Sequence, residues 1–102
     1  MIHVIATIET KPGMREDFLA AFAELVPDVQ AEQGCIEYGP AIDLATSIGD
    51  QPSPRDNVVT VIEKWQSVDA LQKHLEAPHM ARYRRTVKDI VLGVSIRVLE
   101  PA

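Results

Sequence analysis

Apolar positions recur with a period of two over residues 2–9, which is the pattern of a β-strand. One face of this segment carries Ile2, Val4, Ala6 and Ile8. The opposite face is also apolar near the start of the segment. We therefore expect a strand that is covered on both sides.

The period becomes helical after Pro12-Gly13, which predicts a helix that starts near Met14. Its apolar stripe consists of Met14, Phe18, Ala21, Phe22, Leu25 and Val29. Proline lacks the amide hydrogen that a helix uses, so Pro27 is expected to kink this helix or to force a new turn. Gly34 is the expected C-terminal stop.

Two further strands are predicted on either side of a long loop. Residues 35–44 have apolar side chains at even spacing, and Gly39-Pro40 within them predicts a bulge or an edge position. Residues 58–62 are β-branched throughout, which favours a strand. Between these strands, Thr46 to Asn57 is rich in proline and polar residues and is predicted to be a loop. We expect this loop to cover a pocket or to reach a partner subunit.

The C-terminal third predicts a helix, a break and a final strand. Ser67 is a good N-cap for the helix, and Pro78 interrupts it. A second helical piece follows, with an apolar stripe of Met80, Tyr83, Val87 and Ile90. Residues 92–99 then predict a strand.

The resulting order is β-α-β-β-α-β. This order predicts an α+β, ferredoxin-like fold with an antiparallel sheet, in which the second helix is broken at Pro78. Residues 1–102 are expected to form one domain, because a chain of this length can bury a single core but not two.

The helices of such a fold cover only one face of the sheet. We expect the other face to carry Ile5, Val59, Val61 and Trp65, which together are too apolar to remain in water. A second copy that packs sheet against sheet is the expected solution. An ion pair between Glu63 and Arg97 is also expected, on the assumption that their strands are neighbours.

Charge and composition exclude several classes of function. The net charge of −5 opposes binding to nucleic acid or to anionic lipid. No segment approaches the roughly 20 apolar residues that span a bilayer, and no signal peptide is evident, so the cytoplasm is the expected location. The single cysteine, Cys35, excludes an intrachain disulfide and a cysteine-rich metal site, and we expect it to be a buried, unreactive thiol.

Histidines and aromatic residues are the remaining candidates for chemistry. His74 and His79 are five residues apart across Pro78, which is not the spacing of a helical zinc pair, so no metal site is expected. Histidine suits acid–base catalysis, and aromatic side chains suit the walls of a pocket. Structural roles stay open: a backbone hydrogen bond for His74, helix capping for His79 and packing for Trp65.

Several short motifs occur in the order of a known family. They are Lys11-Pro12-Gly13, Gly34-Cys35, Glu63-Lys64-Trp65, Ser67, and His74 with His79. In this order and spacing, over nearly the whole chain, the sequence resembles the antibiotic biosynthesis monooxygenase family, the small domains related to quinol monooxygenases.

This resemblance implies a homodimer that forms an α+β barrel. It also implies oxidation of a small aromatic hydroquinone or phenol by O₂, with no flavin, haem or metal cofactor. His74 would be the base, and His79 a reserve base or a partner for the oxyanion. Tyr38, Trp65 and Tyr83 would orient the substrate ring.

The haem-degrading branch of the family is disfavoured. Its asparagine, tryptophan and histidine align with Ala6, His74 and Arg84. Two alternatives to an oxygenase stay open: an isomerase of a small carbonyl compound, and a non-catalytic module that binds small molecules or acts in stress responses.

Overall fold

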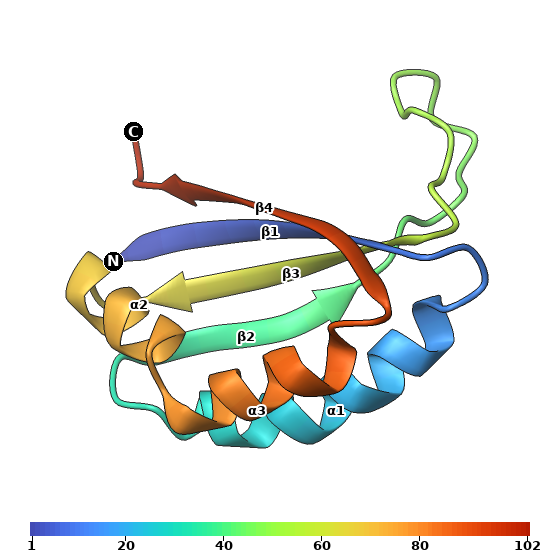
Figure 1. The fold of residues 1–102 in the computed structure, drawn as a ribbon. Coiled ribbons are helices and arrows are strands. Elements are labelled where there is room, and N and C mark those ends of the chain that lie inside the picture. The colour runs from blue at the N-terminus through green and yellow to red at the C-terminus, as the bar shows by residue number, and fades with distance from the viewer.

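The computed structural model describes residues 1–102, which form one four-stranded sheet and three helices (Figure 1). The elements are β1 (Ile2–Thr10), α1 (Arg15–Gln30), β2 (Cys35–Ala41), β3 (Val58–Trp65), α2 (Val68–Leu75), α3 (Pro78–Val87) and β4 (Val91–Leu99). The strands pair antiparallel in the order β2-β3-β1-β4. The α+β, ferredoxin-like fold with its second helix broken at Pro78 is therefore confirmed.

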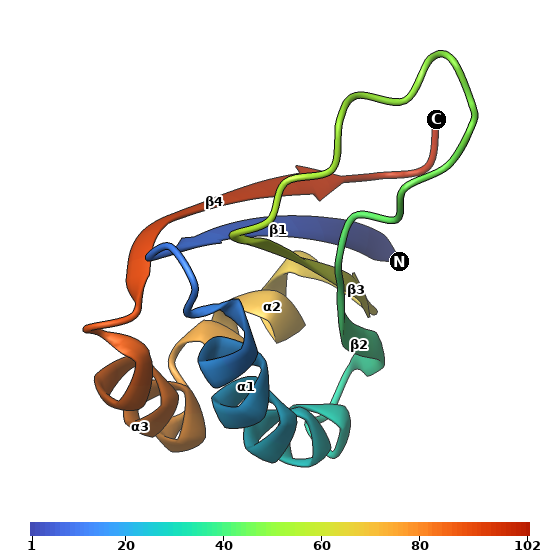
Figure 2. The ribbon, with the colours of Figure 1, turned by 90° about the vertical axis from the view of Figure 1, so that its right-hand side faces the viewer.

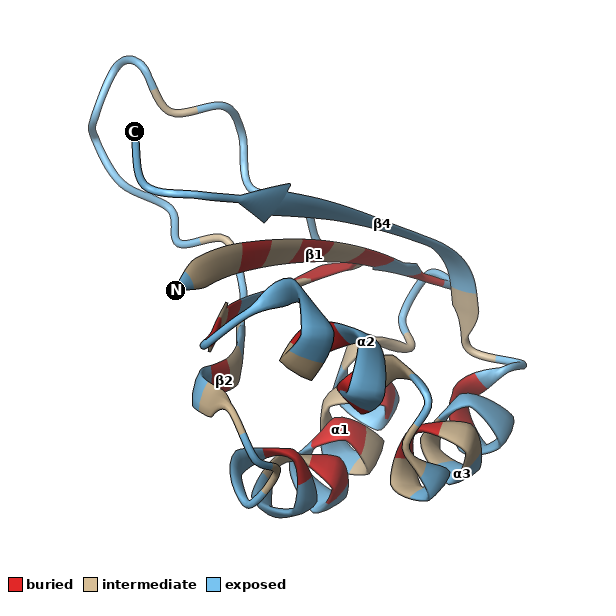
Figure 3. Ribbon diagram, turned by 90° about the vertical axis from the view of Figure 1, so that its left-hand side faces the viewer, coloured by how far each residue is buried: buried red, intermediate tan, exposed pale blue.

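All three helices lie on one face of the sheet, which leaves the other face open (Figures 1 and 2). The alternation in β1 follows from this arrangement. Val4, Ala6 and Ile8 are buried on the helix side, whereas the residues between them are more exposed. Buried and less buried bands therefore alternate along β1 in Figure 3. The period of two predicted for this strand is confirmed.

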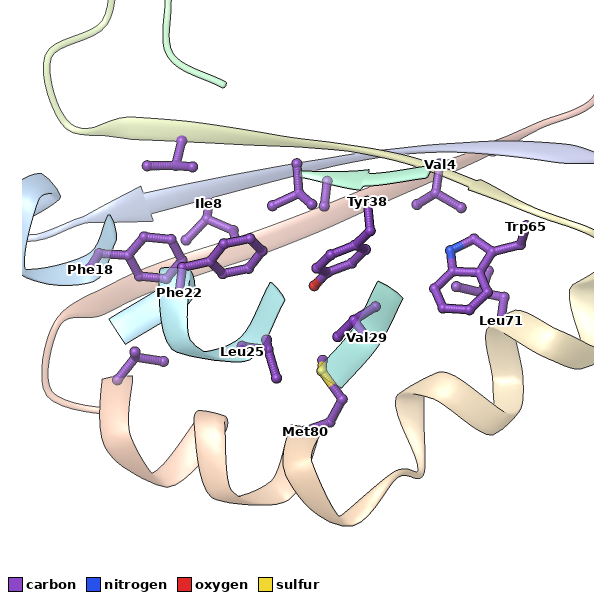
Figure 4. Close-up of a cluster of buried hydrophobic side chains, with 14 residues drawn as sticks. Val4, Ile8, Phe18, Phe22, Leu25, Val29, Tyr38, Trp65, Leu71 and Met80 are labelled. Atoms are coloured by element: carbon purple, nitrogen blue, oxygen red, sulfur yellow. The ribbon is translucent and has the colours of Figure 1, made fainter. Parts of the chain in front are cut away.

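Helix α1 supplies much of the core. Phe18, Phe22, Leu25 and Val29 of its predicted stripe are buried against the sheet (Figure 4). The helix runs through Pro27, so no new turn begins there, although the proline removes the hydrogen bond that an amide at this position would donate to the carbonyl of Ala23. Although α1 ends at Gln30, before the predicted stop, Gly34 has φ +88° in the turn that follows.

Gly34 is required where this turn meets α2. A Cβ at this position would lie 2.6 Å from Ala70 Cβ, which is far inside van der Waals contact. The carbonyl of Gly34 also accepts a hydrogen bond from the amide of Gln66, just before α2. The turn and the start of α2 are thereby held together.

The predicted assignment of the sheet faces is wrong for β3. Ile5 lies opposite Ile62, and Ala6 lies opposite Val61. Because residues opposite each other share a face, Val61 points toward the helices and Ile62 points to the open face. Val59 and Trp65 are on the helix side with Val61, and all three are fully buried.

The expected ion pair between Glu63 and Arg97 does not form. Strand β1 lies between β3 and β4, so the two residues are not on neighbouring strands. Arg97 lies opposite Ile5, on the open face. Glu63 is buried on the helix side.

Strand β2 is at the edge of the sheet, as Gly39-Pro40 predicted. The register shift falls between Cys35 and Glu37, and the strand ends at Ala41, short of the predicted boundary. Cys35 is partly exposed, whereas the sequence predicted a buried thiol. Its partial burial, and to a smaller extent the negative charge of Glu32, raise the pKa of the thiol.

The connection from β2 to β3 contains no helix or strand and projects on the open side of the sheet (Figures 1 and 2). At its base, Arg55 Nε and Nη2 donate to the two carboxylate oxygens of Asp43, at 2.8 and 3.0 Å. The prediction of a loop is confirmed, and its proposed roles stay predictions.

None of the three helices combines the length and apolar character that crossing a bilayer requires.

Candidate active site

Helix α2 places His74 in the interior. The hydroxyl of Ser67 accepts a hydrogen bond from Ala70 N, so the predicted N-cap forms. Leu71 and His74 are three residues apart and therefore share one face of the helix, which is buried. His74 is only 2% exposed, which is more burial than the sequence predicts.

The break at Pro78 places His79 close to His74. Ala77 is extended and Pro78 occupies the first turn of α3, so the chain turns between the two helices. Glu32, a residue in the turn after α1 that the sequence did not single out, links the two histidines. Its Oε2 lies 2.8 Å from His74 Nδ1 and 2.7 Å from His79 Nε2.

The hydrogen bond to Glu32 determines which ring nitrogen of His74 carries the proton. An ionised carboxylate only accepts hydrogen bonds, so His74 carries its N–H on Nδ1. Its Nε2 is then unprotonated in the neutral ring. Burial lowers the pKa of His74, against the opposing effect of the bond to Glu32. The imidazole is therefore neutral at neutral pH and can accept a proton on Nε2.

A cavity of about 400 Å³ lies between α3 and the helix-side face of β1 and β4. Apolar side chains form most of its wall. Its lining includes Ala6, Ile8, Phe22, Val61, Met80, Val87, Val94 and Ile96. His74, Glu63, Tyr38 and Tyr83 are among the few polar groups that line it. The cavity is thus mostly apolar, with a titratable imidazole and a carboxyl group in its wall.

Both cavity tyrosines are neutral hydrogen-bond donors. Tyr38 extends from β2 toward the helices (Figure 4), and its ring lies 5.4 Å from the ring of His74. Burial raises the pKa of Tyr38 and of Tyr83 far above their ordinary value. Neither hydroxyl forms a hydrogen bond with another protein group. Every fully buried side-chain N or O atom in the protein has a hydrogen-bond partner. The two hydroxyls are therefore not fully buried, and they border the accessible space of the cavity.

Trp65 and His79 do not line this cavity. Trp65 is fully buried behind His74, with 4.7 Å between the ring centroids. His79 lines a smaller hollow of about 270 Å³ between α1 and α3. The structure therefore brings His74, Tyr38 and Tyr83 together at one cavity, while Trp65 and His79 support it from outside.

Glu63 is a titratable cavity residue that the sequence analysis treated as structural. Its Oε1 accepts a hydrogen bond of 2.9 Å from Trp65 Nε1. Burial raises its pKa to about 7, and the indole bond only partly opposes this rise. The sequence signal was its position between Val61 and Trp65 on one face of a strand, because a carboxyl on an apolar face is costly unless it has a role.

Comparison with known proteins identifies the family. The sequence matches the family described as "Antibiotic biosynthesis monooxygenase" over residues 1–86. The chain belongs to the antibiotic biosynthesis monooxygenase (ABM) family. It is 43% identical over 103 residues to the Escherichia coli protein named "Probable quinol monooxygenase YgiN", covering 99% of this chain and 98% of that one.

Solved structures agree with an ABM fold. PA3566 from Pseudomonas aeruginosa superposes with a TM-score of 0.80 at 28% identity, covering 99% of this chain and 93% of that one. Rv0793 from Mycobacterium tuberculosis superposes with a TM-score of 0.79 at 25% identity, covering 99% and 94%. Membership of the ABM family supports a monooxygenase type of function for this chain.

Proposed function

We propose that this protein is a cofactor-independent monooxygenase that oxidises a small aromatic hydroquinone or phenol with O₂. The observation that carries this proposal is His74. It lines an apolar cavity, and Glu32 holds its Nδ1, which leaves Nε2 free to accept a proton. The identity to YgiN supports the same substrate class.

His74 starts the reaction by removing a phenolic proton from the substrate. The hydroquinone anion then transfers one electron to O₂, which produces a semiquinone and superoxide. These two species combine through a new carbon–oxygen bond to give a peroxide. Loss of water from this peroxide leaves one oxygen atom in the product, so that hydroquinone and O₂ become hydroxyquinone and water. The substrate supplies all the electrons, and the balance needs no external reductant.

The cavity favours these steps in two ways. Its apolar wall limits the water that would solvate the substrate anion, and a less solvated anion gives up an electron to O₂ more readily. Its donors, the hydroxyls of Tyr38 and Tyr83 and the guanidinium of Arg84, suit the negative charge that develops on oxygen. Arg84 is held in place through a 2.8 Å hydrogen bond from Nη2 to the carbonyl of Leu75.

Glu32 and His79 act as positioning residues. A carboxylate bonded to Nδ1 selects one tautomer of His74 and stabilises the imidazolium that forms when Nε2 is protonated. His79 donates to the same oxygen from outside the cavity, so its effect on turnover is indirect.

A second copy of the chain belongs to the proposal. The open face of the sheet carries Ile5 and Ile62 on its two central strands and Leu99 at the end of β4, and Ile62 and Leu99 are 42% and 44% exposed. Packing two such faces would remove these side chains from water. Sedimentation of the wild type and an Ile62→Glu variant tests this: a monomeric wild type would contradict the dimer.

An isomerase remains the second candidate, because the cavity wall contains both a carboxyl group, Glu63, whose pKa is raised to about 7, and an imidazole, His74, that can accept a proton. Oxygen separates the two functions. Oxygen uptake and product spectra should be recorded with a panel of benzo- and naphthohydroquinones, in air and under argon. Turnover that stops under argon supports the oxygenase, whereas conversion of a carbonyl substrate under argon would support the isomerase instead.

A further inference from the structure

Glu32, His74 and His79 bring two ring nitrogens and one carboxylate oxygen together from three separate segments. One donor comes from the turn after α1, one from α2 and one from the start of α3. The three ligand-type atoms all lie within 4.8 Å of one another. We propose that these residues form a binding site for a divalent transition-metal ion of the zinc class.

The donor set suits such an ion. Two neutral imidazoles and one carboxylate are the protein ligands of many zinc sites that keep a fourth position open. The same set binds other first-row metals, and its nitrogen content disfavours magnesium and calcium, which prefer oxygen ligands.

Binding of the ion requires the three ligand atoms to rearrange. Metal–nitrogen bonds of about 2.1 Å in a tetrahedral site place the ligand atoms about 3.4 Å apart. The two nitrogens lie 2.8 and 2.7 Å from Glu32 Oε2 and within 4.8 Å of each other. To admit the ion, the carboxylate oxygen must withdraw by roughly 0.6 Å and the two imidazole rings must adjust toward a common centre. Glu32 can make this movement because it lies in a turn rather than in a helix.

The site also has an entry path. His79 borders the hollow between α1 and α3, and its side chain is 17% exposed. Glu24 and Asp28 line the same hollow, opposite a single cation, Arg82. The excess of negative charge attracts a divalent cation, and water in the hollow can fill the remaining coordination position.

Sequence spacing does not reveal this site. The two histidines lie on different helices, and Glu32 is 42 residues before His74 in the chain. Binding of the ion requires neither substrate nor O₂, so the inference does not rest on the proposed oxidation. The two states exclude each other at His74, however: an ion on Nδ1 leaves the ring proton on Nε2, which then cannot accept a proton from the substrate.

Titration of untagged protein with Co²⁺ and Zn²⁺ tests the proposal. The wild type is expected to bind one ion per chain, with visible d–d absorption of tetrahedral or five-coordinate Co²⁺ that Zn²⁺ displaces. Glu32→Gln and His79→Ala should each weaken binding at least about tenfold, since each removes one ligand. These two positions are preferred to His74, whose burial makes its loss a risk to folding.

The third histidine provides a matched control. His3 lies on β1, opposite Leu99, on the open face of the sheet and away from the proposed site. His3→Ala should bind Co²⁺ as the wild type does. Circular dichroism without metal checks that each variant is folded. Absence of binding by the wild type, or equal binding by the wild type and a folded His79→Ala variant, would overturn the proposal. Either result leaves the oxygen-uptake assay of the proposed function unaffected.

Discussion

The helices cover one part of the sheet and leave another part of the same face uncovered. Over β3, Val59, Val61 and Trp65 are fully buried. On β4, Val94 and Ile96 point to the same side, yet they are 62% and 46% exposed. The difference is visible in the burial pattern of the strands (Figure 3).

This contrast explains where the cavity comes from. Helices α1 and α2 pack on β2 and β3, whereas α3 packs on α1 and leaves β4 free. The cavity lies where the helical layer ends. Its apolar wall includes β4, while its polar groups His74, Glu63 and Tyr38 come from the covered part, where packing fixes their positions.

The largest effect is expected from removing the base in the covered part. His74→Gln keeps a neutral side chain of similar size but cannot accept a proton, so oxygen-dependent turnover should fall by about 10²- to 10⁴-fold. The matched His79→Gln variant should lose less, because His79 lies outside the cavity. Initial rates of oxygen uptake by folded variants measure both. Equal losses would show that His74 has no special role.

The second prediction concerns the pH dependence of stability. The pKa of Glu63 is raised from 4.5 to about 7 by burial, so the folded protein retains a proton that the unfolded chain has lost. The stabilisation from the neutral carboxyl is fully present below pH 4.5 and is lost as pH rises through about 7. At about 1.4 kcal/mol per pKa unit, this loss is of order 3 kcal/mol.

Glu63→Gln stays neutral and should not show that loss. Urea denaturation at stepped pH should give unfolding free energies for the two proteins that diverge between the two pKa values, in favour of the variant. Parallel curves would mean that the carboxyl titrates normally and is not buried in solution.

A matched pair of valines measures the contrast between the two parts directly. Val59→Ala should lower the free energy of unfolding by about 2 kcal/mol, because it leaves a space in a packed interior. Val94→Ala, the same change on the uncovered strand, should cost less than about 0.5 kcal/mol. Urea denaturation of both variants gives the comparison. Equal costs would indicate that a second copy or another segment covers β4 in solution.

The smallest effect is expected from the projecting loop. Replacing residues 44–54 with a short Gly-Ser connection should change stability little, because the segment packs on neither part of the sheet and loop length has a weak entropic effect. Thermal unfolding measures this effect, and sedimentation and substrate affinity measured alongside it address the two predicted roles. If dimerisation and affinity are also unchanged, the loop neither covers the pocket nor reaches a partner.

The order of the elements and the residues of the α1 stripe could be predicted from the sequence, because local periodicity and backbone restrictions decide them. The alternation in β1, the break at Pro78 and the Ser67 cap each depend on neighbours within a few residues. The edge position of β2 also followed locally, since Pro40 cannot donate to a second strand. His74 is a candidate by residue type, and the family resemblance adds Tyr38 and Tyr83.

Only the tertiary structure decided which face of β3 is covered, because a strand that is apolar on both sides does not specify its register with its neighbours. The same holds for Glu32, whose contact with both histidines depends on how the turn after α1 packs against α2, far away in the chain. The cavity also depends on the packing of α3 against α1, which leaves β4 uncovered. These features arise from contacts between distant segments, and no local pattern in the sequence encodes them.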